Sequence, residues 1–227
     1  MHWRVMTYNI HHGADVDGKA ALARQAALIA NLGPDLVALQ EVDRFLPRSR
    51  MRDQARLLAA AGGMEFVFSA NLRWLGFMQY GNAVLSRRPF GGYKHLPLPD
   101  RGEKRGLLVA RIDGEREPVF FLCVHLGLDH RDRRRQLSII RRTVAALNGP
   151  VILAGDFNTT PGSGELDLLG ELLRPAALRL PTFPSDRPRF PLDNVFYSPH
   201  WRTTAVSTPL STASDHLPLL VNLCRSD

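Results

Sequence analysis

Short apolar runs bounded by turn residues recur along the whole chain of 227 residues. Each run has the length of a strand, and flanking Gly, Pro, Asn or Asp residues are typical of strands buried in a sheet. The pattern predicts strands over residues 3–10, 35–41, 65–69, 82–86, 106–112, 118–126, 150–156, 192–197, 203–207 and 217–224. We therefore expect a protein rich in β-structure.

Three segments carry helical spacing of their apolar residues instead. They are residues 20–32, 53–61 and 132–147, and each is followed by glycine or proline, the usual end of a helix. In the last segment apolar residues recur every three or four positions from Leu137 to Leu147, between arginines. This spacing predicts a surface helix that covers a sheet.

Strand–helix and strand–strand successions both occur, so a purely alternating parallel fold is not expected. The order of elements favours an α/β (α+β) class, with two sheets packed face to face and flanked by helices. A chain of this length with 44% hydrophobic residues can build one large core, so we predict one domain over residues 1–227. Residues 175–191, rich in Pro and Arg, are expected to form an irregular loop at the rim.

The chain is basic, with a formal net charge of +7. Such a charge favours a polyanionic partner, whether nucleic acid, an anionic lipid surface or a phosphorylated metabolite. However, only three of the 29 basic residues are lysine, and an arginine-favouring genome explains the charge equally well.

Both cysteines, Cys123 and Cys224, sit inside apolar runs and predict neither a disulfide nor a thiolate metal site. The sequence begins directly with a strand-like segment, without a leader pattern, and no window resembles a membrane span. We therefore expect a cytoplasmic protein in a reducing compartment, without stable membrane insertion and monomeric.

Polar side chains repeatedly follow the apolar runs. Alone, each is explained by an ordinary turn or cap, but together they predict one site assembled from strand ends. In an extended chain Asp156 and Asn158 would share a face, with Phe157 pointing away as an anchor. The residues at strand ends are Asn9, Glu41, His125, Asp156, Asn158, Asp193, Asp215 and His216.

Carboxylate and amide oxygens dominate this set, and thiolates are lacking. Hard oxygen donors suit Mg²⁺ or Mn²⁺ better than zinc. The two histidines, His125 and His216, can donate to a phosphate or shuttle a proton near neutral pH. The combination indicates hydrolysis of a phosphate ester.

Five segments in order along the chain carry a family resemblance. They read Met-Thr-Tyr-Asn-Ile at 6–10, Leu-Gln-Glu-Val-Asp at 39–43, Gly-Asp-Phe-Asn at 155–158, Leu-Asp-Asn-Val-Phe at 192–196 and Ser-Asp-His at 214–216. A further Val-His-Leu-Gly-Leu at 124–128 is followed by Arg133 and Gln136. In residues, order and spacing the chain resembles the endonuclease/exonuclease/phosphatase superfamily with the DNase I-like fold, and its small bacterial members most.

The resemblance implies a four-layer sandwich of two mixed sheets between helices, with the site where strand ends converge. It implies that Glu41 is the principal ligand of a Mg²⁺ or Mn²⁺ ion, with Asn9 beside it and Asp215 on the far side.

The same resemblance gives the remaining motif residues catalytic roles. Asp156 would orient the attacking water, and Asn158 would hold that water or a phosphate oxygen. His216, held by Asp193, would contact the scissile phosphate, and His125 would stabilise the developing negative charge. In-line attack on phosphorus needs these functions.

Three further residues are candidates for substrate contact, namely Asn82, Arg105 and Arg133. Asn82 is read equally well as a buried amide that bonds to backbone groups, and Arg105 as a solvated loop residue. His11 and His12 are not expected to bind metal, because neighbouring residues of a strand point to opposite faces.

The superfamily leaves the substrate open. We favour a phosphodiesterase or nuclease that acts on nucleic acid, with a phosphohydrolase of a small or lipid-borne phosphate, sphingomyelinase-like or inositol-phosphatase-like, as the alternative. A binding module without chemistry is disfavoured because every motif position keeps a competent side chain. The short segment between Asn158 and Asp193 leaves little room for loops that grip a duplex, and the lack of a leader disfavours a secreted DNase.

Overall fold

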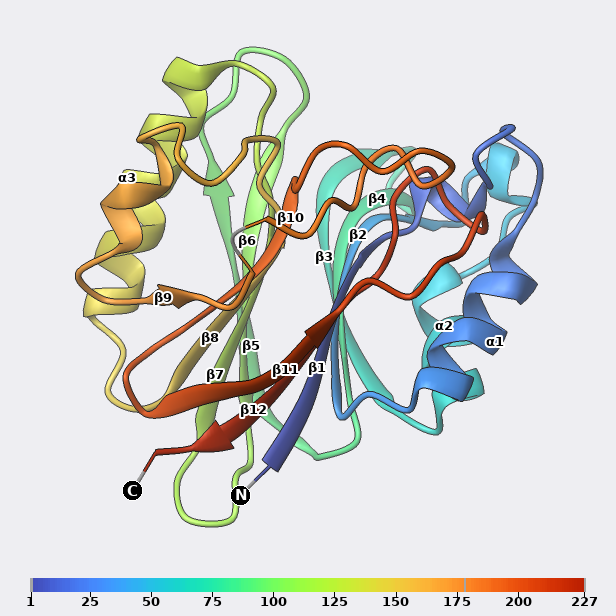
Figure 1. Ribbon diagram of the computed structural model, residues 1–227. Coiled ribbons are helices and arrows are strands. Elements are labelled where there is room, and N and C mark those ends of the chain that lie inside the picture. The colour runs from blue at the N-terminus through green and yellow to red at the C-terminus, as the bar shows by residue number, and fades with distance from the viewer. Residues whose placement is uncertain (1, 178, 227) are drawn as a thin grey trace.

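The computed structural model describes residues 2–177 and 179–226. Its twelve strands form two six-stranded sheets that pack face to face (Figure 1). Both sheets are mixed, and helices cover their outer faces. The predicted α/β sandwich is confirmed.

The first sheet contains both ends of the chain. Its strands are β1 (His2–Asn9), β2 (Leu36–Arg44), β3 (Glu65–Trp74), β4 (Met78–Ser86), β11 (Trp201–Ser207) and β12 (Leu219–Arg225). They lie in the order β11-β12-β1-β2-β4-β3. β1 and β2 are parallel, and the other neighbours are antiparallel.

The second sheet is built from the middle of the chain. Its strands are β5 (Phe90–Leu98), β6 (Arg105–Ile112), β7 (Val119–His125), β8 (Val151–Asp156), β9 (Arg174–Pro175) and β10 (Asp193–Tyr197). They follow the order β5-β6-β7-β8-β10-β9, with β7 and β8 as the parallel pair. Each sheet therefore has one central pair of parallel strands. The two strands of a pair have their carboxyl ends side by side, at the same end of the sheet.

Three α-helices form the outer layers. α1 (Leu22–Leu32) and α2 (Gln54–Gly62) cover the first sheet, and α3 (His130–Ala145) covers the second (Figure 1). Gly33 and Gly63 end the first two helices in the left-handed conformation, which glycine adopts without steric cost. In the residues that the structure describes, no helix is long and apolar enough to cross a membrane.

Three hydrophobic clusters correspond to the interfaces between these layers. One, with Trp3, Phe121 and Trp201, fills the space between the two sheets. A second packs α3 against its sheet, and a third packs α1 and α2 against theirs. Each sheet is thus buried on both faces, which explains why its central strands read as continuous apolar runs.

Two strands were missed from the sequence. β5 is an edge strand whose residues are mostly exposed and include Gly91, Gly92, Lys94 and His95, so it has no apolar run to reveal it. β9 is a two-residue strand inside the stretch expected to be a loop. In addition, the strand predicted to end at residue 69 continues to Trp74 and forms a hairpin with β4, because the exposed end of a hairpin does not need apolar residues.

Phe157 follows β8 directly and packs beneath the predicted site, so its removal tests how much this packing stabilises the fold. Its ring is fully buried and meets Phe196 edge-on, with centroids 5.0 Å apart. Phe157→Ala is expected to lower the free energy of unfolding by about 3–5 kcal/mol, because it leaves a cavity against α3. Denaturant unfolding measures this.

The matched control is Phe77→Ala in the β3–β4 hairpin, where the side chain is 49% exposed. Its effect should stay within about 0.5 kcal/mol. Equal losses for both variants would show that Phe157 is not a packing anchor.

Candidate active site

A row of polar residues crosses the second sheet where β7 and β8 end and β10 begins. The strand register places Asp156 between His125 of β7 and Asp193 of β10. Gly155 precedes Asp156, and a Cβ at that position would lie 2.0 Å from the carbonyl oxygen of Val124. A glycine is therefore needed for β7 and β8 to approach closely at this point.

Asn9 connects this row to the other sheet. Its Nδ2 donates to Asp156 Oδ2 at 3.1 Å and to Glu41 Oε1 at 3.0 Å. Its Oδ1 accepts a bond from the backbone N–H of His11 at 3.1 Å. One buried amide thus joins two carboxylates from opposite sheets.

Glu41 reaches the site through an irregularity in β2. The pairing of β2 with β4 shifts between Leu39 and Val42, and Glu41 has a left-handed φ of 59°. A bulge of this kind redirects a side chain, and a left-handed glutamate carries backbone strain. Burial acts to raise the pKa of Glu41, but the nearby His12 imidazole and the Asn9 amide outweigh it and hold the pKa well below its usual range. The side chain is an anion.

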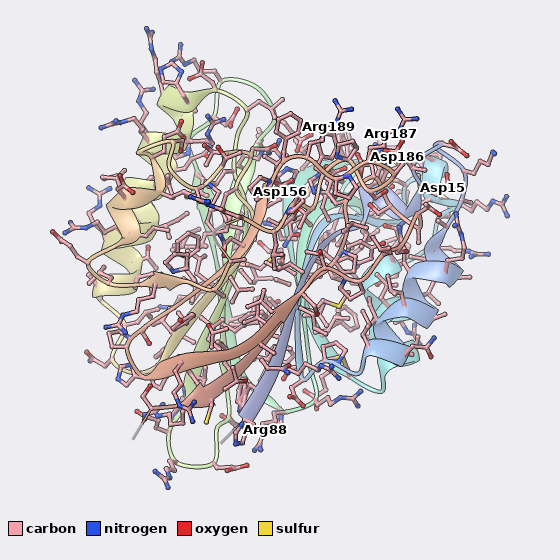
Figure 2. The ribbon with its side chains drawn as sticks, viewed as in Figure 1. Asp15, Arg88, Asp156, Asp186, Arg187 and Arg189 are labelled. Carbon is pink, nitrogen blue, oxygen red and sulfur yellow. The ribbon has the colours of Figure 1, made fainter. Side chains whose placement is uncertain are left out.

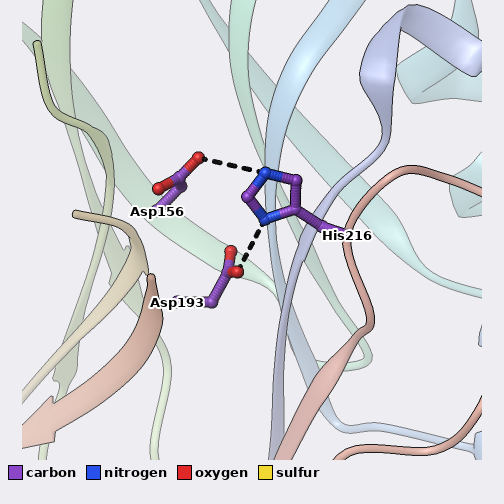
Figure 3. A group of neighbouring side chains, drawn as sticks. All are labelled: Asp156, Asp193 and His216. Atoms are coloured by element: carbon purple, nitrogen blue, oxygen red, sulfur yellow. Dashed lines mark hydrogen bonds and ion pairs between the residues drawn. The ribbon is translucent and has the colours of Figure 1, made fainter. Parts of the chain in front are cut away.

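His216 lies between two carboxylates, as Figure 3 shows. Its Nδ1 is 2.8 Å from Asp193 Oδ2, and its Nε2 is 3.7 Å from Asp156 Oδ2. Burial acts to lower the pKa of His216, but the charges of Asp193 and Asp156 outweigh it and raise the pKa. Burial also raises the pKa of Asp156 above its ordinary value, with His216 opposing the rise. Asp193 orients the ring, since a carboxylate accepts from Nδ1–H.

His125 approaches Asp156 from the other side. Its Nε2 is 3.4 Å from Asp156 Oδ2, and its Nδ1 is 3.0 Å from Arg105 Nη1. A guanidinium can only donate, so Nδ1 accepts and the ring proton resides on Nε2. Burial and the neighbouring Arg105 charge lower the pKa of His125 to about 3. His125 is therefore a neutral N–H donor directed at the site.

Asn158 is placed by a turn rather than by the strand. β8 ends at Asp156, and Asn158 has a left-handed φ of 49°. Its N–H donates to Asp156 Oδ1 at 2.9 Å, and its Nδ2 donates to the carbonyl oxygen of Leu126. Asp156 and Asn158 both line the cleft while Phe157 is buried, as expected, but a turn rather than the alternation of an extended chain brings them together.

His11 and His12 also lie differently from the prediction. The chain leaves β1 at Asn9 and makes a 3₁₀ turn over His11–Gly13, with both histidines left-handed. Both line the cleft, because neither belongs to a strand. His11 Nδ1 is 3.9 Å from Asp215 Oδ1, and His12 Nδ1 is 3.9 Å from Glu41 Oε2.

The site opens into a cleft of about 650 Å³. Eight of the residues predicted from strand ends or loops line it: Asn9, Glu41, Arg105, His125, Asp156, Asn158, Asp215 and His216. Asp193 lies behind His216 and is fully buried. The sequence did not reveal Arg48, Trp74, Tyr80 and Phe183, which line the cleft from the β3–β4 hairpin and from loops.

Comparison with known proteins agrees with this geometry. Residues 6–216 match the endonuclease/exonuclease/phosphatase family. The chain belongs to this family. It is 30% identical to the uncharacterized protein YbhP of Escherichia coli, over 96% of this chain and 94% of YbhP.

Solved structures share the fold of this chain. A structure from Beutenbergia cavernae superposes with a TM-score of 0.81 at 28% identity, covering 99% of this chain and 72% of that one. A mannosyl-6-phosphatase of Bacteroides thetaiotaomicron gives a TM-score of 0.79 at 17% identity, covering 98% and 99%. Members of the endonuclease/exonuclease/phosphatase family are divalent-metal-dependent phosphoric ester hydrolases.

Two groups of side chains in this family member have the chemistry of a metal site. Asp156, Asp193 and His216 offer ligand atoms within 4.8 Å of one another. However, Asp193 Oδ2 and His216 Nδ1 already form a hydrogen bond with each other, which leaves only their other ligand atoms for an ion. Glu41 and Asp215 instead present partly exposed carboxylates beside Asn9 in the cleft. Such a set of hard oxygen donors fits Mg²⁺ or Mn²⁺.

Two of the three tentative substrate residues lie outside the cleft. Arg133 makes a buried bidentate ion pair with Glu165, at 2.6 and 2.9 Å, and donates to the carbonyls of Gly127 and Leu128. Asn82 Nδ2 donates to the carbonyl of Gly106 and links the two sheets. Their positions do not support substrate contact, because both side chains are committed to structural bonds. Arg105 does line the cleft.

The Asp193–His216 pair provides a test of the site in this family member. Asp193→Asn keeps the volume but removes the charge that orients the ring, so kcat should fall about 10²–10⁴-fold. The change is measured on a phosphodiester with metal present. The control is Asp186→Asn in the exposed neighbouring loop, which should leave kcat unchanged. An unaltered kcat in Asp193→Asn would remove this pair from the catalytic site.

Proposed function

We propose that the protein is a divalent-metal-dependent phosphodiesterase that cleaves nucleic acid by in-line attack of water on phosphorus. One observation carries the proposal: a single carboxylate, Asp156, is bonded to Asn9 and flanked by the imidazoles of His125 and His216 at 3.4 and 3.7 Å. An acceptor for a water proton and donors for phosphate oxygens thus converge at one point.

The proposed roles follow from the hydrogen bonds of each residue. Asp156 accepts a proton of the attacking water and orients it, and Asn158 contacts that water or a phosphate oxygen. His125 donates from Nε2 to the phosphate, because its Nδ1 accepts from Arg105. His216 contacts the scissile phosphate, with Asp193 keeping its ring in place.

The metal site is proposed at Glu41, Asn9 and Asp215. Glu41 and Asp215 line the cleft with partly exposed carboxylates that suit Mg²⁺ or Mn²⁺, and Asn9, whose Oδ1 accepts from the His11 N–H, lies beside them. When bound, such an ion neutralises phosphate charge and stabilises the developing negative charge. Asp156, His125 and His216 remain free to orient water and phosphate.

The charges and aromatic groups around the cleft support nucleic acid as the substrate. Arg48 and Arg105 line the cleft, each already paired with a carboxylate, and Trp74, 43% exposed, stands at its wall. Exposed aromatic rings stack on bases, and arginines contact phosphates. Figure 2 shows Arg187 and Arg189 at the same end of the molecule as Asp156. The cysteines are free and buried, so we propose a reducing, cytoplasmic setting.

A second candidate is hydrolysis of a small or lipid-borne phosphate. It is favoured by apolar side chains near the cleft: Leu75 is 82% exposed, Phe77 49% and Leu128 77%. Leu75 and Phe77 occupy the tip of the β3–β4 hairpin, next to the cleft residue Trp74. Apolar tips of this kind can enter a lipid surface.

The nuclease proposal predicts cleavage of DNA or RNA in Mg²⁺ or Mn²⁺, abolished by EDTA. Glu41→Gln should lower kcat/KM at least about 100-fold and weaken metal binding measured by calorimetry, because it removes a ligand charge. Glu65→Gln on exposed β3 is the control and should behave as wild type. If the protein hydrolyses bis-p-nitrophenyl phosphate yet leaves all nucleic acids intact, the nuclease proposal is wrong and the esterase remains.

The lipid alternative predicts a different response to changes at the hairpin tip. Leu75→Ser/Phe77→Ser should lower turnover of a phospholipid in vesicles about tenfold or more, while a water-soluble head-group ester is hydrolysed as before. Leu57→Ser on the outer face of α2, 42% exposed, is the control. If the protein does not hydrolyse the phospholipid in vesicles, or if the variant changes turnover of both substrates by the same factor, the lipid alternative is wrong.

A further inference from the structure

A second, smaller cavity lies beside the active cleft. It measures about 280 Å³, and its lining includes Arg48, Arg50 and Arg52. His12 and Arg48 line both this cavity and the active cleft, so the two cavities share a wall. We call the smaller cavity the arginine groove. None of the residues that line it is among the predicted catalytic or metal-binding residues.

The charged residues that line the arginine groove are all basic. None of its lining residues is acidic. Arg48 is held by Asp43, with both bonds at 2.8 Å. Arg50 and Arg52, by contrast, are exposed and make no ion pair with any residue that the structure describes. Two cations without a protein partner thus face the same small cavity.

The segment that carries these arginines has an unusual backbone. After a 3₁₀ turn at Pro47–Ser49, Arg50 and Met51 both adopt a left-handed φ of 56°. Arg48 lies over the Tyr80 ring, 5.2 Å from its centroid, at the wall of the active cleft. Arg48 therefore marks the border between the cleft and the groove, with Arg50 and Arg52 beyond it.

The N-terminus of α1 adds to the positive character of the groove. Leu22 and Ala23, the first residues of α1, are among its lining residues. The N-terminus of this 11-residue helix has no side-chain cap and no acidic residue in its first turn. The positive end of the helix dipole therefore acts in the same direction as the arginines.

We propose that the arginine groove binds a second phosphate of the substrate, next to the phosphate that is cleaved. The inference rests on the proposed phosphodiesterase function, and it specifies a substrate with consecutive phosphates, such as a single strand of nucleic acid. A groove that adjoins the cleft and is lined by arginines without acidic residues suits a nucleic-acid backbone that leaves the active cleft. Arg48 separates the two phosphate positions, and Arg50 and Arg52 hold the second phosphate.

The test uses the metal-loaded protein with Arg50→Gln/Arg52→Gln. KM for a short single-stranded oligonucleotide should rise about tenfold at unchanged kcat, and the slope of log KM against log salt should fall by about 0.7 for one lost phosphate contact. Hydrolysis of bis-p-nitrophenyl phosphate, which has one phosphate, should change less than about twofold. Arg134→Gln/Arg142→Gln on α3 removes the same charge from exposed positions in the opposite layer and should leave both substrates unaffected.

A binding measurement separates this inference from the nuclease proposal. Thymidine 3′,5′-bisphosphate should inhibit bis-p-nitrophenyl phosphate hydrolysis about tenfold more strongly than thymidine 5′-monophosphate, and the difference should vanish in Arg50→Gln/Arg52→Gln. If the bisphosphate shows no advantage, or if the α3 pair has the same effect, the groove is not a phosphate site. If the advantage is present but no nucleic acid is cleaved, the groove stands and the nuclease proposal falls.

Discussion

The side-chain amide of Asn9 is the interaction on which the site depends. It donates from the end of one sheet to Asp156 in the other, while also holding Glu41. The residues on either side of this contact are far apart in the chain, and only face-to-face packing of the sheets brings them together. The arrangement of the candidate site is therefore a property of the sandwich as a whole, because neither sheet contains all of its residues.

Much of this arrangement could be predicted from the sequence because the sheets are buried on both faces. Burial makes the central strands apolar, and their ends are then visible as abrupt changes to polar residues, as at Asp156 and Asp215. Edge strand β5 and the two-residue β9 are exposed or too short to leave such a pattern. Family motifs then supplied roles that spacing alone does not give.

The remaining features depend on local backbone geometry that periodicity does not encode. The bulge at Glu41, the turn at Asn158 and the 3₁₀ turn at His11 each depart from the alternation of a strand. Arg133 shows the opposite case, where a motif position is occupied by a structural ion pair with Glu165. Such a partner lies too far along the chain for spacing to reveal it.

Residues with a left-handed backbone conformation cluster around the cleft, and this affects which substitutions the protein can accept. His11, His12, Glu41 and Asn158 all have a positive φ, which glycine adopts far more easily. At Glu41 and Asn158, a glycine would relax the backbone and remove a functional group at the same time. Under the proposed function, substitutions selected only for thermal stability would therefore tend to erode activity here, and these positions would record a compromise between folding and chemistry.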